Sequence, residues 1–419
     1  MSTESLSRQD MDFFTWPGGH DTSDYVVATY RVETAVDPEL CAIAMAKEQS
    51  LATLRIELGT HRPSPALAAR VVSVATLAEV MDCLQPEFRL STEVYPTPAT
   101  GHARRRLTLS IAYPLEAIGP SISNLWNVVL GEIPRLGFLS AARLVDIQLP
   151  PAFLAAFPGP RHGVPGLRSA TGVLDRPLLC RSCRPAMGLS VQAMRDINTQ
   201  VLQGGFDAVK DDELTRASSE QNYRHRVSEL AAGTRAAEQH TGERKLYFAN
   251  TIEDLATSMA LAEIAGDSGA DGIIIAPAIQ GLACAQWFAS HSGLPLLAHN
   301  TVEDVYTRSP RFGVSPAVYL MLQRICGADL VFLPGNFGTG AEDAAEIAQA
   351  VSACLAPLAH IAPCWPIIAG GKRPERMGDY GAQIDSRDFM VIAASAVDEH
   401  PDGMAAGAQA FRVALEKLR

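Results

Sequence analysis

The stretch GGFDAVKDDE, residues 204–213, carries the pattern on which the fold of this chain depends. It opens on two glycines, continues as a short apolar run and ends in a lysine followed by acidic residues. A buried strand with polar residues at its carboxyl end is typical of a parallel sheet whose function lies just beyond its strands. Because side chains alternate along a strand, we expect Lys210 and Asp212 to point the same way. Glu213 follows where the strand gives way to a loop.

Short apolar runs of this kind alternate with helical segments from residue 150 to the end of the chain. The eight strand candidates are Leu178–Cys183, Phe206–Val209, Leu246–Ala249, Gly272–Ala276, Pro295–Ala298, Asp329–Leu333, Pro366–Ala369 and Phe389–Ala393. This number and spacing predict a TIM (β/α)8 barrel. The alternative is a doubly wound open sheet, although no GxGxxG follows the first strand.

The first part of the chain has a different pattern. Residues 24–149 mix strands such as YVVATYRVET with two helices, at 37–50 and 121–130, which predicts a small α+β domain with an antiparallel, ferredoxin-like sheet. A connector rich in proline and glycine, residues 150–166, places the domain boundary near Pro150. Residues 1–23 are expected to form a polar tail.

Composition narrows the class of protein. The chain has 419 residues and a formal net charge of −11, which argues against a general nucleic-acid or anionic-membrane binder. Eight cysteines are too few for a disulfide scaffold, and the first residues lack a signal-peptide pattern. The longest apolar stretch, 272–289, is broken by Pro277, Gln280 and Gln286, as in a buried strand followed by a helix. We therefore expect a cytoplasmic protein.

The end of the 204–213 stretch suggests metal chemistry. Asp212 and Glu213 offer hard oxygen ligands suited to Mg²⁺. A lysine beside them would repel the ion, unless its amine has taken up CO₂, because the resulting carbamate is an anion with two oxygens. The alternative is that Lys210 pairs with the neighbouring acids on a solvated loop.

At this point the sequence resembles a known family. GGFDAVKDDE is similar to the metal-binding motif of the RuBisCO large-chain superfamily, and FPGPRHGVPG, GVLDRPLL and RPAMGLS are similar to its connector and first barrel strand. KLYFANT and LPLLAHN resemble the third and fifth strands, and YVVATYRVE and PSISNLWNVVLGE resemble parts of the N-terminal domain. The likeness runs in the right order from about residue 24 to the last helix.

The resemblance implies roles for residues of the barrel. Lys210 would be the carbamylated lysine and general base, with Asp212 and Glu213 as its fellow Mg²⁺ ligands. His299, which follows the fifth strand, matches the family's active-site histidine. A structural histidine is the alternative for this position.

The resemblance also implies an obligate homodimer with shared active sites. Glu48, Thr53 and Asn124 match N-terminal residues that the family lends to the partner subunit's substrate site. An ordinary helix-cap or surface role is the alternative for each of the three.

Departures from the family pattern point away from CO₂ fixation. Arg184 replaces a lysine that donates protons in true carboxylases; arginine is always charged and cannot shuttle protons, but it can stabilise an enolate. Asn300 stands where the family has a phosphate-gripping arginine, and Phe332 where it has a histidine. The loop LPGNFGTGAEDAA, residues 333–345, contains no lysine to close over a carboxylated intermediate.

One phosphate subsite is therefore predicted to be lost and the other weakened. Gly370 and Gly371 are kept, but Ala394, Ser395 and Ala396 replace a triple glycine whose backbone amides cradle a phosphate. Arg181, Lys372 and Arg373 near strand ends are candidates to hold one phosphate or a carboxylate, with solvated rim charges as the alternative.

These features resemble a RuBisCO-like protein of the form IV type, with Mg²⁺ and CO₂ (as lysine carbamate) as its cofactors. The expected activity is decarboxylation or C–C cleavage of an oxo-sugar acid, with Lys210, Arg184 and His299 as catalytic residues. Asn300, Gly370 and Gly371 are expected to bind substrate. An enolase or isomerase of the methylthioribulose type and a non-catalytic regulatory dimer stay open. Neither nucleic acid nor membrane is an expected partner.

Overall fold

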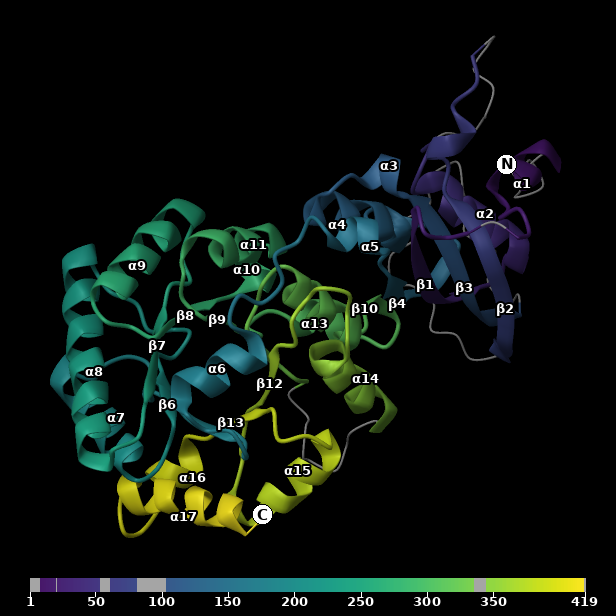
Figure 1. The fold of residues 1–419 in the computed structure, drawn as a ribbon. Helices are drawn as coiled ribbons and strands as arrows, with labels where there is room; N and C mark the ends of the chain where they lie inside the picture. The colour runs from purple at the N-terminus through teal and green to yellow at the C-terminus, as the bar shows by residue number, and fades with distance from the viewer. Residues whose placement is uncertain (1–7, 20, 53–60, 81–102, 335–343, 418–419) are drawn as a thin grey trace. The chain divides into compact units, whose positions relative to one another are not determined.

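The computed structural model describes residues 8–19, 21–52, 61–80, 103–334 and 344–417 (Figure 1). The chain divides into two compact units. One consists of Met1–Ala156 together with Glu303–Tyr319, and the other of Phe157–Val302 together with Leu320–Arg419. The sequence predicts a continuous second domain, so the transfer of residues 303–319 to the first unit is a feature that the sequence does not reveal.

The first unit is built on a five-stranded sheet of order β10-β4-β1-β3-β2. Its strands are β1 (Tyr25–Thr34), β2 (Arg70–Val80), β3 (Arg104–Pro114), β4 (Leu139–Gln148) and β10 (Phe312–Val314). The pairings of β1 with β3 and β4, and of β2 with β3, are antiparallel, as predicted. β10 is the exception because it runs parallel to β4, and it comes from the segment that follows strand β9 (Leu296–Ala298) of the second unit.

Helices complete this unit, and side chains mark their starts. The helices are α1 (Arg8–Phe14), α2 (Pro38–Glu48), α3 (Leu115–Ile118), α4 (Ile122–Leu130), α5 (Pro151–Leu154) and α12 (Asp304–Thr307). Asp37 accepts hydrogen bonds from the backbone amides of the first turn of α2, and Ser121 does the same for α4. Such caps satisfy amides that have no partner within the helix.

The residues before β1 differ from the polar tail that the sequence predicts. Phe13 and Phe14 of α1 are buried, and the Trp16 amide donates to the Val71 carbonyl of β2 at 2.9 Å. The aromatic residues in this segment bury enough apolar surface to hold it against the sheet.

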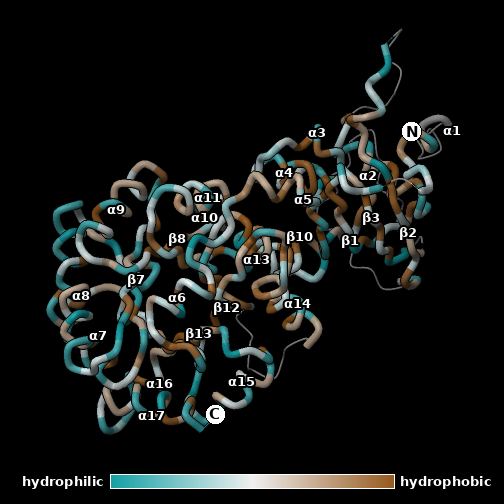
Figure 2. The backbone as a smooth tube through the Cα atoms, in the orientation of Figure 1, coloured by the Kyte–Doolittle hydropathy of each residue, from teal (hydrophilic) through white to brown (hydrophobic). Residues whose placement is uncertain are grey.

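The second unit is a closed barrel of eight parallel strands, which confirms the predicted fold (Figure 1). The strands are β5 (Leu178–Ser182), β6 (Ala208–Lys210), β7 (Leu246–Asn250), β8 (Gly272–Ile275), β9 (Leu296–Ala298), β11 (Leu330–Phe332), β12 (Trp365–Ile368) and β13 (Met390–Ile392). Each predicted strand candidate overlaps one of them, and β6, β7 and β12 extend one residue beyond the predicted range. The strand residues are buried and for the most part apolar, and Figure 2 colours the backbone by hydropathy.

Helices surround the strands. The longer ones are α6 (Gly163–Thr171), α7 (Val191–Gln203), α8 (Glu220–Thr241), α9 (Leu255–Asp267), α11 (Leu282–His291), α13 (Pro316–Ile325), α14 (Ala344–Leu355), α15 (Met377–Ile384) and α17 (Met404–Glu416). Two single turns, α10 (Pro277–Gln280) and α16 (Ser395–Asp398), lie in loops after β8 and β13. In the part of the chain that the structure describes, none of the helices combines the length and hydropathy of a membrane span.

Inside the barrel, side chains from the strands form the core. It includes Leu178, Cys180, Ala208, Phe248, Ile274, Leu297, Leu330, Trp365, Ile367 and Met390. At the amino ends of the strands, Arg176 makes two hydrogen bonds with Asp207, at 2.7 and 2.6 Å, and Asp207 also accepts from the Leu179 amide. This buried pair joins the start of β5 to the start of β6, so that the carboxyl ends of the strands are presented in a fixed register.

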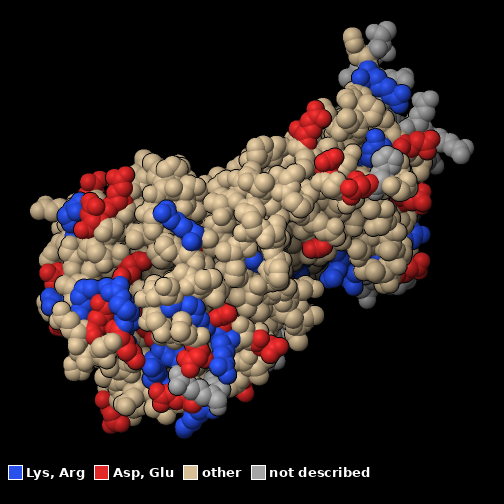
Figure 3. Space-filling model, in the orientation of Figure 1, with Lys and Arg blue, Asp and Glu red and all other residues tan. Residues whose placement is uncertain are grey.

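On the face drawn in Figure 3, basic and acidic side chains lie next to one another where charges gather, and much of the remaining surface is uncharged. The seven cysteines among the described residues are buried free thiols.

Candidate active site

Lys210 is the last residue of β6, and its side chain is buried. Its Nζ donates to the backbone carbonyl of Asp211 at 2.9 Å and lies 3.6 Å from Oε2 of Glu213. A buried lysine that faces a carboxylate fits the predicted cluster and differs from the solvated loop of the alternative interpretation.

Asp212 is buried beside the end of the neighbouring strand β5. Its Oδ2 accepts from Arg184 Nε at 3.1 Å and lies 3.5 Å from the hydroxyl of Ser182. Its Oδ1 accepts from the backbone amide of Leu214 at 3.1 Å. These contacts hold the carboxylate at the mouth of the barrel.

Glu213 lies between Lys210 and His299. Its Oε2 is 3.1 Å from Nε2 of His299. Burial alone raises the pKa of Glu213, but His299 and Lys210 outweigh it and lower this pKa well below its usual value. The glutamate is therefore a carboxylate at neutral pH.

His299 follows β9 and is largely buried. Burial lowers its pKa from the ordinary 6.5, against the opposing effect of Glu213. Its Nδ1 accepts a hydrogen bond from the Thr301 amide at 3.1 Å, so the neutral ring carries its proton on Nε2. The ring of Phe332 packs against it, with ring centroids 4.7 Å apart.

A cavity of about 130 Å³ opens above these residues at the carboxyl ends of the strands. Its walls include Arg184, Lys210 and Glu213 on one side and residues 369–373 and 394–396 on the other. Gly370 and Gly371 have φ of 78° and 59°, a conformation that L side chains rarely adopt, so the sequence keeps glycine at the two positions.

Two cations line the cavity next to these glycines. They are Lys372 and Arg373. Lys372 is buried, and its Nζ lies 5.3 Å from the centre of the Tyr380 ring. Together with Arg184 on the facing side, the two residues bring three positive charges to the lining of the cavity. Arg181, the further candidate for anion binding, is wrongly assigned, because its fully buried guanidinium pairs with Asp398 at 2.9 Å. An arginine in the middle of a strand points to the side opposite its neighbours, here away from the cavity.

The remaining predicted residues lie elsewhere. Asn300 is half-buried after His299 and does not line the cavity. Glu48 is half-buried at the end of α2, and its pKa is raised by burial and by Glu132. The Asn124 side chain donates to the backbone carbonyls of Ala117 and Ile118, within its own unit. Thr53 lies outside the described residues.

The side chains at the end of β6 fit a magnesium ion if Lys210 is carbamylated. Among the described residues, no three side chains of His, Cys, Asp or Glu converge as a ready metal site. Glu213 Oε2 is buried and accepts no hydrogen bond of good geometry, despite the two nearby nitrogens, so it has capacity for a further positive partner. Two hard carboxylates are thus available, and a third oxygen ligand requires that Lys210 carry one.

Sequence reasoning missed residues that support this cluster. Asn250, at the end of β7, donates from its side chain to the carbonyls of Glu213 and Thr215, both at 3.1 Å, and so fixes the loop after β6. Ser182 and Glu399 border the cavity. The sequence does indicate Asn250, because in KLYFANT it is the polar residue at the carboxyl end of a buried apolar strand.

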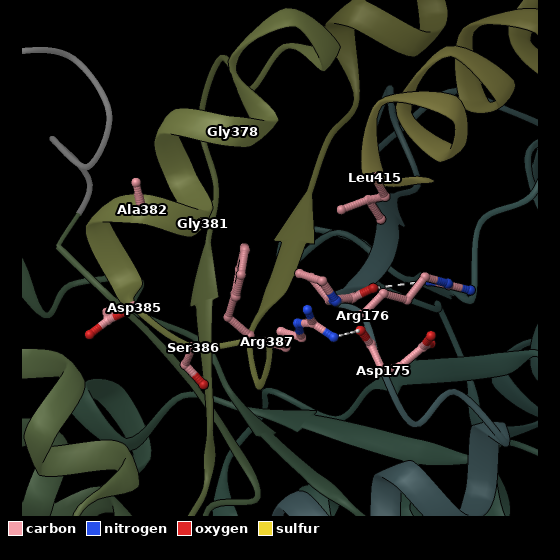
Figure 4. Close-up of a pocket in the computed structure, with 11 residues that line it drawn as sticks. Asp175, Arg176, Gly378, Gly381, Ala382, Asp385, Ser386, Arg387 and Leu415 are labelled. Atoms are coloured by element: carbon pink, nitrogen blue, oxygen red, sulfur yellow. Dashed lines mark hydrogen bonds between the residues drawn. The ribbon is translucent and has the colours of Figure 1, made fainter. Parts of the chain in front are cut away.

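A larger cavity, of about 370 Å³, lies at the opposite ends of the strands (Figure 4). Asp175, Arg176, Arg387 and Leu415 line it, and the figure shows its polar groups bound to one another: Arg387 donates to the Asp175 carbonyl and Arg176 to that of Pro177. In a TIM barrel this end serves stability, whereas the carboxyl ends carry function. The cavity of about 130 Å³, which Lys210, Glu213 and Arg184 all line at the carboxyl ends, is the candidate active site.

Comparison with known proteins shows which family the chain belongs to. Residues 163–419 match the ribulose bisphosphate carboxylase large chain, catalytic domain, and residues 64–153 match the N-terminal domain of the same chain. A ribulose bisphosphate carboxylase-like protein of Allochromatium vinosum is 31% identical, over 97% of this chain and 87% of its own. A 3-oxo-isoapionate-4-phosphate decarboxylase of Rhizobium rhizogenes is 29% identical, over 93% of this chain and 92% of its own.

Solved structures are similar over the same extent. Octameric Rubisco from Pyrococcus horikoshii has a TM-score of 0.83 at 27% identity, covering 98% of this chain and 93% of that one. Dimeric Rubisco from Hyperthermus butylicus has a TM-score of 0.81 at 26% identity, covering 97% and 93%. With its barrel, its N-terminal sheet and its full-length relatives, the chain belongs to the RuBisCO large-chain superfamily, among the RuBisCO-like proteins.

Proposed function

We propose that this protein is a Mg²⁺-dependent lyase that decarboxylates, or cleaves a C–C bond of, a 3-oxo sugar acid carrying one phosphate. The observation that carries the proposal is the cluster of Lys210, Asp212, Glu213 and His299 beneath a cavity with a cationic wall. The decarboxylase of Rhizobium rhizogenes, similar over nearly its whole length, supports the reaction class.

The metal site would be assembled by a covalent step at Lys210. The Lys210 ammonium first loses a proton to solvent, and the neutral amine then attacks the carbon of CO₂. A C–N bond forms and a second proton leaves the nitrogen to solvent, so that a cation becomes an anionic carbamate. Lys210, Asp212 and Glu213 would then hold Mg²⁺ with oxygen ligands. When bound, the ion acts as a Lewis acid toward the carbonyl oxygen of a substrate.

The side chains of the cavity account for the reaction itself. As the bond between the α-carbon and the carboxylate breaks, CO₂ leaves and the electron pair moves toward the ketone oxygen, where Arg184 stabilises the enolate charge. A proton from solvent, relayed by His299, then takes the place of the lost carboxylate on carbon. Arg184 cannot act as the acid because its guanidinium stays charged.

The opposite wall suits one phosphate. Lys372 and Arg373 follow the two glycines at the end of β12, where backbone amides and cations can share an anion. Two features of the sequence argue against a bisphosphate substrate and against CO₂ fixation. Residues 333–345 contain no lysine, and Ala394 and Ala396 stand where the family has glycine.

We further propose a cytoplasmic homodimer with shared sites. Apolar side chains stand exposed four or five residues after each of five consecutive barrel strands: Met187, Leu214, Leu255, Ile279 and Val302. An apolar arc of this kind suits an interface between proteins. We propose that a second copy of the chain covers this apolar arc. The solved Rubisco structures named above are an octamer and a dimer, which supports self-association. In such a dimer, Glu48, Thr53 and Asn124 would serve the partner's site.

The test is a screen of 3-oxo sugar acids and their monophosphates for CO₂ release in deuterated water. Release that depends on Mg²⁺ and is lost in Lys210→Ala, but kept in the surface control Lys417→Ala, supports the proposal. Deuterium exchange without CO₂ release identifies an isomerase instead. Turnover that persists in Lys210→Ala overturns the metal-carbamate assignment, and no turnover of any compound by a folded, Mg²⁺-loaded protein favours the regulatory dimer.

A further inference from the structure

Asp211 stands between two proposed metal ligands but faces away from them. It is fully buried, as are Lys210 and Asp212 on either side. Lys210 lines the cavity and Asp212 contacts Ser182 and Arg184, which also line it, whereas the Asp211 side chain has its partners on β7 and α8. A carboxylate with no water around it must find its partners within the protein.

Three donors surround the Asp211 carboxylate. Tyr247 of β7 donates from its hydroxyl to Oδ1 at 3.1 Å, and the Asn250 amide donates to Oδ2 at 3.1 Å. Arg226 of α8 approaches Oδ2 with Nη2 at 3.4 Å. Strand β7 and helix α8 are thus both tied to this one residue.

The protonation states of Tyr247 and Arg226 suit them as hydrogen-bond donors to the Asp211 carboxylate. Burial raises the pKa of Tyr247, and the Asp211 charge raises it further, so the phenol stays protonated and remains a donor. The Arg226 guanidinium lies 5.1 Å from the centre of the Tyr223 ring, which adds a cation–π contact.

The backbone of Asp211 links the network to the candidate metal site. Its amide donates to the Phe248 carbonyl at 3.0 Å, and its carbonyl accepts from Lys210 Nζ at 2.9 Å. Holding the Asp211 side chain fixes both adjacent peptide planes, and with them the directions of Lys210 and Asp212.

We propose that Asp211 is a positioning residue, which holds Lys210 and Asp212 in the arrangement that captures CO₂ and a divalent cation. The inference rests on the proposed metal-carbamate function and adds a residue that touches neither substrate nor metal. A carbamate nitrogen keeps one hydrogen, so it retains a donor for the Asp211 carbonyl after CO₂ is taken up. Outer partners of this kind change metal affinity by about 10- to 100-fold.

The decisive variant is Asp211→Asn, which keeps the size of the side chain but turns an acceptor into a donor that faces Tyr247, Arg226 or the Asn250 amide. The matched control is Asp271→Asn. Asp271 also accepts from an arginine, Arg235 at 2.7 Å, and from a backbone amide, that of Tyr247 at 3.0 Å. It precedes β8, so it lies at the amino ends of the strands, away from Lys210.

The experiment measures Mn²⁺ binding by electron paramagnetic resonance and the carbamate carbon by NMR in ¹³C-bicarbonate with Mg²⁺, on the full chain below its unfolding temperature. We expect Asp211→Asn to bind Mn²⁺ about 10-fold or more weakly and to lose or shift the carbamate signal. Asp271→Asn should match the wild type within about twofold, since a general loss of stability does not change the site of a folded protein.

Each remaining outcome is informative. If the wild type forms the carbamate and Asp211→Asn matches it in both readouts, the positioning role is wrong and the proposed function stands. If the wild type itself shows neither carbamate nor Mn²⁺ binding, the positioning role of Asp211 and the proposed metal-carbamate function are both wrong. Should Asp211→Asn fail to fold, Tyr247→Phe replaces it: a fall in Mn²⁺ affinity of at least about threefold supports the role, and unchanged affinity overturns it.

Discussion

Arg184 Nε lies 3.1 Å from Oδ2 of Asp212, so the arginine proposed to act on the substrate also contacts an oxygen proposed to bind the metal. The side chain of Arg184 is 57% exposed, whereas that of Asp212 is 3% exposed. An ion pair open to water on one side contributes only about 0–1 kcal/mol. A divalent cation can therefore displace the arginine, which leaves its guanidinium directed to the cavity.

This competition predicts opposite effects of Arg184→Met on binding and on turnover. Mn²⁺ affinity should stay equal or rise by up to about fivefold, because about 1 kcal/mol of competing ion pair is removed. Turnover of an identified substrate should fall by about 100-fold or more, since a donor to the enolate is lost. Titration calorimetry and steady-state kinetics measure the two effects. Arg195→Met, which breaks a half-exposed pair with Glu229 on the surface of the barrel, should change neither.

Phe332 supports the ring of His299 from the neighbouring strand. Because its side chain is buried between the barrel core and the cavity, Phe332→Ala should lower the free energy of unfolding by about 3–5 kcal/mol, and Phe332→Leu by less than about 1.5 kcal/mol. We expect Phe332→Leu to retain the fold but to lower kcat, since His299 loses one wall. Urea denaturation and kinetics test the pair. A loss below about 1 kcal/mol in Phe332→Ala would mean that the ring is not part of the core.

The barrel and the cluster at its mouth were predictable from the sequence for one physical reason. A parallel strand buried on both faces is a short apolar run, and its polar terminus stands at the functional end. GGFDAVKDDE contains both signals, so it locates a strand and predicts that Lys210 and Asp212 share a face. The structure adds the position of His299, 3.1 Å from Glu213, which no local pattern contains.

What the sequence could not provide depends on contacts between distant residues. Arg181 reads as a basic residue near a strand end, but its partner Asp398 is 217 positions away. β10 has only three residues and no periodicity of its own, and it forms a strand because the edge of β4 is available to it. The donors to Asp211 come from a different strand and a helix, so a carboxylate in a KDDE run gives no sign that it faces away from the metal.

The Arg181–Asp398 pair predicts a stability effect near the site. Asp398→Asn would leave the guanidinium buried with a neutral partner, which should cost about 2–3 kcal/mol of unfolding free energy. Arg181 also donates to the Arg184 carbonyl at 3.1 Å, so the ends of β5 and β13 should loosen together. Denaturation with urea measures the cost. Glu132→Gln, which breaks an exposed pair with Arg135, is the control and should cost less than about 0.5 kcal/mol. Equal effects of the two substitutions would contradict the prediction.

Glu243 predicts a pH dependence of stability away from the active site. Its carboxylate accepts from Lys245 at 2.8 Å and from Arg412 at 3.2 Å. Burial raises its pKa, but these cations outweigh burial and lower it below the ordinary 4.5. Because the folded pKa lies below the unfolded one, Glu243 stabilises the fold above pH 4.5, and this contribution is lost as the pH falls through the folded pKa.

The free energy of unfolding of Glu243→Gln should therefore lie below that of the wild type at pH 7, and the gap should close as the pH falls through the folded pKa. Urea denaturation at a series of pH values between 7 and 3 measures the gap. In a Lys245→Met background the same substitution should have a smaller effect at pH 7, because one of the cations that lower the pKa is gone. A gap that stays constant or widens toward low pH would show that Glu243 gains nothing from its charge in the folded state.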